Sequence, residues 1–164
     1  MKTLADRFRR WYEYERDCTA KTLAMLDTVP AEKRADPLFQ KAIDKFAHMD
    51  AARLRWLHRL GHWPELPPAF PPGLKLEDLP ARFAATEAAW TKFLATVDDA
   101  ALVSPFEWKA PDGNRYRWEI EGALSTLNGH AHYHRGQVVT CVTLLGGKAV
   151  DTDYFFWCHL TPLG

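Results

Sequence analysis

Apolar side chains recur at intervals of three and four residues along most of the chain, which is the spacing of one face of an amphipathic helix. One such segment covers about residues 3–29 and is closed by Pro30. A second covers about residues 37–61, with Gly61 suited to cap it, and a third begins near Asp78. The side chains that define these three faces are, in order, Leu4, Phe8, Trp11, Glu15, Cys18, Thr22 and Met25; Phe39, Ala42, Phe46, Leu57 and Leu60; and Phe83, Trp90, Phe93, Leu94 and Val97.

The hydrophobic period changes to two between Phe106 and Trp118. Alternating aromatic residues flank a turn at Asp112-Gly113, which predicts a short two-stranded ribbon. A fourth long helix is predicted over about residues 120–145, where a pair of glycines ends it. The aromatic tail, residues 151–158, is too apolar to be free, so we expect it to pack back on the helices or to form a dimer contact.

Four amphipathic helices with one hairpin favour an all-α four-helix bundle, because a single hairpin cannot build a core of its own. The short β-ribbon comes directly before the last helix. The proline-rich run at residues 64–72 is predicted to be an ordered connection between the second and third helices. Since no repeat or interdomain linker stands out, residues 1–164 are interpreted as one domain.

Composition narrows the classes of function. Hydrophobic residues make up 47% of the chain, and Lys+Arg and Asp+Glu are balanced at 21 each. That balance offers no basic surface for nucleic acid or for a membrane, and no apolar run reaches the roughly 18 residues of a transmembrane span. Three widely spaced cysteines without a CxxC pair fit a reduced, cytoplasmic protein.

Two histidines in the predicted fourth helix carry the clearest chemical signal. His130 and His134 are four residues apart, which places both imidazoles on one helix face with Cβ atoms roughly 5–6 Å apart. Two rings so placed can bind one divalent ion at about 2.0–2.1 Å each, although a pair of surface or core histidines without metal is an equally common arrangement. His132 lies about 200° around the helix and is not expected to be a ligand.

The third ligand must come from another segment, and the pattern leaves the choice open. His48 has small neighbours on its side, but an ideal helix turns it away from the apolar face of its own segment. It is therefore either a solvent-facing histidine or a ligand that lines an open cleft. The other histidines considered are His58 and His62, which straddle a helix end and form a weaker pair, and His159.

The order of these residues resembles the DinB-like (DinB/YfiT-type) family of metalloenzymes. The run His130-Ala-His-Tyr-His134-Arg135-Gly136-Gln137 is similar to the HxxxHRGQ segment of that family's last helix. The run from His48 to Leu57 is similar to the segment that carries its first metal histidine, and the aromatic tail after the glycines is similar to its ending. One departure is Gly129, where many members have Asn immediately before the first histidine of the pair.

The resemblance implies a metal site formed by His48, His130 and His134, in an up-down-down-up bundle that is often a homodimer. Three neutral imidazoles leave a coordination position open, as in catalytic zinc sites. That position suits a hydrolytic water or a substrate thiol, and the resemblance favours a thiol-dependent S-transferase over a hydrolase acting on a small molecule. A non-catalytic, stress-related metal-binding module is the alternative.

Zinc is the expected ion and nickel the next, with a low-molecular-weight thiol as a possible co-substrate. No general base is assigned. Arg135 is expected to form a salt bridge or helix contact, and Gln137 to bind a neighbouring helix. Glu121 and Tyr133 are considered as acid–base groups, and Tyr12, Tyr14 and Glu15 as residues of the first helix that face the cleft.

Overall fold

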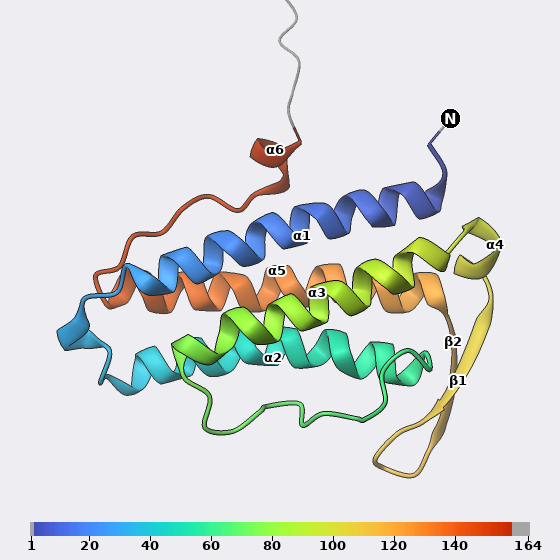
Figure 1. The fold of residues 1–164 in the computed structure, drawn as a ribbon, viewed down its shortest axis with the longest axis horizontal. Coiled ribbons are helices and arrows are strands. Elements are labelled where there is room, and N and C mark those ends of the chain that lie inside the picture. Colours follow the sequence, from blue (N-terminus) through green and yellow to red (C-terminus); the bar gives the residue numbers. More distant parts are fainter. Residues whose placement is uncertain (1, 159–164) are drawn as a thin grey trace, which may run out of the picture.

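Four long helices dominate the computed structural model, which describes residues 2–158 (Figure 1). They are α1 (Leu4–Asp27), α2 (Pro37–Arg59), α3 (Leu79–Thr96) and α5 (Ile120–Leu144). The antiparallel strands β1 (Pro105–Lys109) and β2 (Arg115–Glu119) precede α5, as the change of period predicts. The remaining elements are short: the 3-10 turns η1 (Ala31–Lys33) and η2 (Leu76–Asp78), and the helices α4 (Asp99–Leu102) and α6 (Tyr154–Trp157), which the hydrophobic pattern did not predict.

The four long helices run up, down, down and up (Figure 1). The connection between α2 and α3 travels back along the bundle, so these two helices point the same way. Helix α5 packs against α1 and α2, and α3 packs against the same two from the other side. The all-α bundle with a short ribbon is thereby confirmed, and α2 and α5 are direct neighbours.

Local sequence signals fix where the helices start and stop. Thr3 forms a capping box with Asp6 at the start of α1, and the Asp36 side chain caps α2. Gly61 and Gly146 follow the ends of α2 and α5 with φ of 79° and 83°, a left-handed conformation that glycine adopts without a Cβ penalty.

The core lies between the four helices and contains the predicted apolar faces. Phe46 of α2 stacks on Phe83 of α3 at 4.3 Å between ring centroids, and Trp90 is 2% exposed. One residue of the predicted α1 face departs from this pattern: Trp11 is 38% exposed. No helix among residues 2–158 combines the length and the apolar character that crossing a bilayer requires.

The β-ribbon is anchored to the bundle by aromatic contacts. Phe106 pairs with Trp118 and Trp108 with Tyr116 across the strands, and the ring of Trp56 from α2 lies 5.5 Å from Trp108 and 5.7 Å from Trp118. The turn has the predicted chemistry, since Gly113 has φ 89°.

The C-terminal segment, residues 148–158, returns along α1 (Figure 1). The Tyr14 hydroxyl donates to the Thr152 carbonyl, and its ring meets Tyr154 edge-on at 5.1 Å between centroids. Arg10 donates to the carbonyl of Cys158. The tail thus packs back on the bundle; the dimer contact stays a prediction.

Candidate metal centre

Three histidines converge where α2 and α5 pack together. His48 comes from the middle of α2, and His130 and His134 come from consecutive turns of α5. One ligand atom from each lies within 4.8 Å of the other two, and the Nε2 atoms of His48 and His130 are 3.0 Å apart. Within residues 2–158 this is the one group of three His, Cys, Asp or Glu side chains so placed.

The spacing fits a divalent ion. Two imidazole nitrogens bound at 2.0–2.1 Å lie about 3.3–3.4 Å apart around a tetrahedral ion and about 2.8–3.0 Å apart around an octahedral one. The 3.0 Å between the Nε2 atoms of His48 and His130 matches the octahedral spacing, and the ligand atom of His134 lies within 4.8 Å of both residues' ligand atoms. The donor set suits zinc or nickel, because neutral imidazole is a ligand for both.

A loop, rather than a neighbouring helix, holds His48. Its Nδ1 donates to the backbone carbonyl of Ala69 over 2.6 Å, which leaves Nε2 free to bind a metal. The ring of Phe70 stacks on it at 4.1 Å with an interplanar angle of 6°. His48 is therefore half-buried beneath the proline-rich connection, and the solvent-facing alternative is wrong.

His134 is oriented within its own helix. Its Nδ1 donates to Oε1 of Gln137 over 3.0 Å, so its Nε2 is also free for an ion. The prediction that Gln137 binds a neighbouring helix is wrong, because its side chain turns back one helical turn to meet the histidine. His134 is 8% exposed.

The environment favours the neutral, metal-binding form of these rings. Burial lowers the pKa of His130 to about 4, and the neighbouring His134, His48 and Arg53 act in the same direction. Burial also lowers the pKa of His134, against the opposing effect of the Gln137 hydrogen bond. Both rings are neutral at pH 7 and have lone pairs available.

The other histidines considered lie elsewhere. His132 points to the opposite side of α5, where Nε2 meets the Tyr14 hydroxyl at 3.2 Å and Nδ1 donates to the Asn128 carbonyl. His58 donates to the Trp63 carbonyl, and His62 lies against the Phe93 ring. His159 lies outside the described residues.

A buried charge cluster stands beside the centre. Glu15 of α1 accepts from Arg53 of α2 at 2.8 Å and from Arg135 of α5 at 3.0 Å, and these three residues are 2%, 6% and 3% exposed. Arg135 also donates to the Tyr14 hydroxyl. The predicted salt bridge of Arg135 is thus confirmed. Glu15 belongs to this cluster, and the Tyr14 hydroxyl contacts it through Arg135.

At the rim, the Tyr133 ring lies 4.9 Å from the ring of His134 and is 66% exposed. Tyr12 packs against Trp90, and Glu121 lies in the first turn of α5, more than two turns before His130. Of the residues considered as acid–base groups, Tyr133 alone adjoins a histidine of the centre.

Comparison with known protein families gives a match over nearly the whole chain. The sequence profile described as "DinB family" matches residues 1–162, essentially the entire chain. This chain belongs to the DinB family. Its HxxxHRGQ run supplies two of the converging histidines and the arginine of the buried cluster. Neither the curated proteins nor the solved structures gave a match.

Proposed function

We propose that this DinB family protein is a metal-dependent enzyme that acts on a small molecule through one divalent ion bound by His48, His130 and His134. The observation that carries the proposal is the convergence of three imidazoles from two helices, with ligand atoms within 4.8 Å of one another. Two of these rings are kept neutral by burial, which lowers their pKa. Zinc is the proposed ion, followed by nickel.

Three protein ligands suit catalysis better than a structural role, because structural zinc sites use four. A bound ion would supply Lewis-acid chemistry and lower the pKa of a thiol or a water that it holds. A thiol-dependent S-transferase with a low-molecular-weight thiol as co-substrate is the preferred activity, with hydrolysis second. Membership of the family supports this choice but does not fix a substrate.

The surrounding side chains suit a substrate that carries negative charge. The Lys45 ammonium lies 5.6 Å from the Phe70 ring and is close enough to lower the pKa of His134. It can attract a carboxylate or a thiolate toward the histidines. Phe70 covers one face of His48 and keeps water from it, and Tyr133 offers a hydroxyl at the rim.

Metal content tests the site directly. Untagged protein analysed by mass spectrometry should contain about one equivalent of zinc or nickel, and His134→Ala should lose it. His132→Ala is the matched control, since it removes a histidine from the same helix that faces away from the centre. Equal metal content in wild type and His134→Ala would refute the assignment.

Activity and thermal stability separate the enzyme from a non-catalytic module. We expect thiol transfer or hydrolysis in the metal-loaded wild type and in His132→Ala, but not in His134→Ala. A protein that binds one equivalent, melts at a lower temperature after chelation and turns over no thiol acceptor, ester or amide would be the metal-binding, stress-related alternative.

A further inference from the structure

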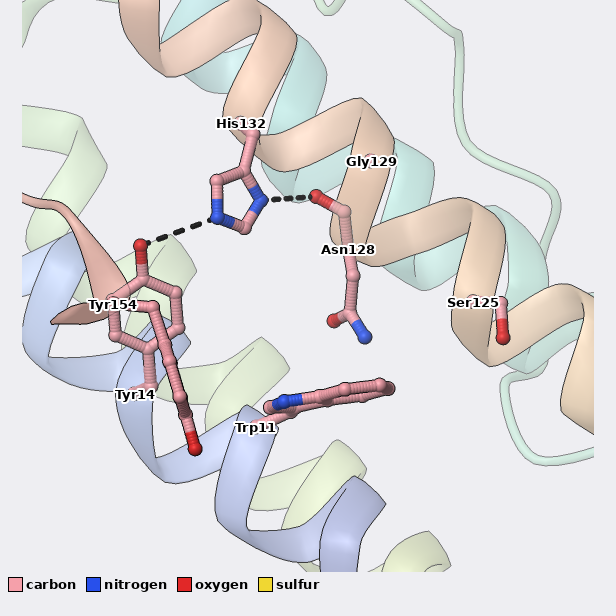
Figure 2. Close-up of a pocket in the computed structure, with 7 residues that line it drawn as sticks. All are labelled: Trp11, Tyr14, Ser125, Asn128, Gly129, His132 and Tyr154. Carbon is pink, nitrogen blue, oxygen red and sulfur yellow. Dashed lines mark hydrogen bonds between the residues drawn. The ribbon is translucent and has the colours of Figure 1, made fainter. Parts of the chain in front are cut away.

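A pocket of about 350 Å³ opens beside α5, on the side that carries His132 (Figure 2). It lies between α1, α5 and the C-terminal segment, and its size falls within the range of small-molecule sites. The lining residues are Trp11, Tyr14, Ser125, Asn128, Gly129, His132 and Tyr154. Nothing in the proposed metal chemistry uses them.

Gly129 leaves the pocket open. A Cβ atom added at this position would meet no atom within 4 Å. The neighbouring turns of α5 place Ser125 and His132 on the same side of the helix (Figure 2). A Cβ at position 129 would therefore point into open space, and a larger side chain there would extend into the pocket.

The walls are aromatic and held in place before any ligand arrives. The Tyr14 hydroxyl is hydrogen-bonded to the Thr152 carbonyl and to Arg135, and His132 is fixed by the Asn128 carbonyl. Trp11 is 38% exposed, and its indole lies beneath the Asn128 carboxamide (Figure 2). Such a preformed aromatic wall binds planar molecules with little loss of side-chain entropy.

Two polar side chains of the pocket are uncharged and free to pair. Asn128 and Ser125 form no side-chain hydrogen bond to any described residue. The carboxamide offers one donor and one acceptor side by side, and the serine offers a hydroxyl. No Asp, Glu, Lys or Arg lines the pocket, and the one basic side chain in its lining is His132, whose two nitrogens already contact the Asn128 carbonyl and the Tyr14 hydroxyl. A charged ligand would therefore lose its hydration without gaining a free ionic partner.

We propose that this pocket is a second binding site, independent of the metal, for a planar uncharged molecule that carries an amide-like donor–acceptor pair, such as an aromatic carboxamide or a lactam ring. The ligand lies against the Trp11 indole and pairs with the Asn128 carboxamide. None of the three histidines lines the pocket, so we expect binding to be independent of His48, His130 and His134.

Three probes of matched size test this assignment by NMR titration of the full chain. Benzamide is planar and uncharged, benzoate is planar and charged, and cyclohexanecarboxamide carries the amide on a ring that is not planar. We expect benzamide to bind with a Kd on the order of 1 mM and to shift the Trp11 indole signal, assigned with Trp11→Phe. The other two probes should bind about tenfold more weakly.

Variants at other positions of α5 separate the pocket from the rest of the helix. Gly129→Leu should abolish benzamide binding, whereas Gly136→Leu, two turns along and also with nothing within 4 Å of an added Cβ, should retain it. Asn128→Leu keeps the bulk but removes the amide, and should weaken binding about tenfold. His134→Ala should bind benzamide like the wild type, even where it loses the metal.

Equal affinity for the three probes would overturn the proposal, as would benzamide binding that survives Gly129→Leu. A wild-type dimer that becomes a monomer in Gly129→Leu, measured by light scattering, would show instead that the pocket is a contact between copies of the chain.

Discussion

At the scale of single residues, His48 and His134 are oriented by different kinds of hydrogen-bond acceptor. His48 donates to a backbone carbonyl, and His134 to the side chain of Gln137. In both cases the bond to Nδ1 leaves Nε2 free, which is the tautomer a metal site needs. The Gln137 partner can be removed by mutation.

Gln137→Leu should weaken metal binding by about 10- to 100-fold, because His134 loses the acceptor that fixes its ring. The affinity can be measured by competition with a chromogenic chelator. Gln40→Leu is the matched control: Gln40 of α2 bonds to Asp44 and to the carbonyl of Leu74 in the following connection, and its loss should leave the affinity nearly unchanged. Equal losses in both variants would contradict this role.

The His130 ring links stability to pH in the metal-free protein. Its pKa is about 4 in the folded chain and near 6.5 in an unfolded one, so between these values the unfolded chain binds more protons. Stability should therefore fall as the pH is lowered from about 6.5 to about 4. An NMR titration should give His130 a midpoint near pH 4, and His130→Gln should flatten the stability profile. A midpoint at or above 6.5 would contradict the described burial.

At the scale of elements, α5 carries two different surfaces. One side presents His130 and His134 toward α2, and the other presents Asn128, Gly129 and His132 toward α1 and the tail. Its glycines show how closely each part is packed. A Cβ on Gly122 would lie 2.3 Å from the Trp118 ring, whereas one on Gly129 would meet nothing.

Two glycine-to-alanine substitutions on α5 should therefore have opposite effects. Gly129→Ala should stabilise the fold by up to about 1 kcal/mol through helix propensity. Gly122→Ala should destabilise it by about 1–3 kcal/mol, because Trp118 is held by Trp56 and cannot move away freely. Urea denaturation measures both. Similar stabilisation in the two variants would mean that the ribbon does not pack on α5 as described.

Much of the element structure follows from local signals, and the parts that do not follow have a common cause. Pro30, Gly61 and Gly146 mark helix ends that the structure places within one or two residues of the prediction.

Helical periodicity places His48 on a polar face, which is correct for α2 in isolation. The covering residue, Phe70, comes from a loop without periodicity, so no pattern within α2 could predict it. The partner of Gln137 cannot be predicted for a related reason: spacing does not say which partner a flexible side chain selects.

At the scale of the whole molecule, a buried ionic cluster joins three of the four long helices. Glu15, Arg53 and Arg135 come from α1, α2 and α5, and each is almost fully enclosed. Two guanidinium groups share one carboxylate there, so loss of the carboxylate leaves two buried cations without an anion. The charge of Arg53 in this cluster also acts to lower the pKa of His130, so the cluster lies close to the metal centre.

Glu15→Gln should lower the free energy of unfolding by about 3–5 kcal/mol. Glu87→Gln is the control, since Glu87 pairs with Arg16 at the surface, where loss of an ion pair costs less than about 1 kcal/mol. Urea denaturation followed by circular dichroism measures both variants. A loss below about 1 kcal/mol in Glu15→Gln would show that the two arginines find other partners.

The acceptor that holds His48 is an oxygen common to every amino acid type. Exchanging Ala69 for another residue leaves that atom in place, so a mutational scan would score the position as tolerant. The hydrogen bond to His48 depends instead on the path of the backbone at residue 69, which the prolines at 67, 68, 71 and 72 restrict on either side. Deleting one residue from this stretch, rather than replacing one, is the change that would displace the carbonyl and release the imidazole.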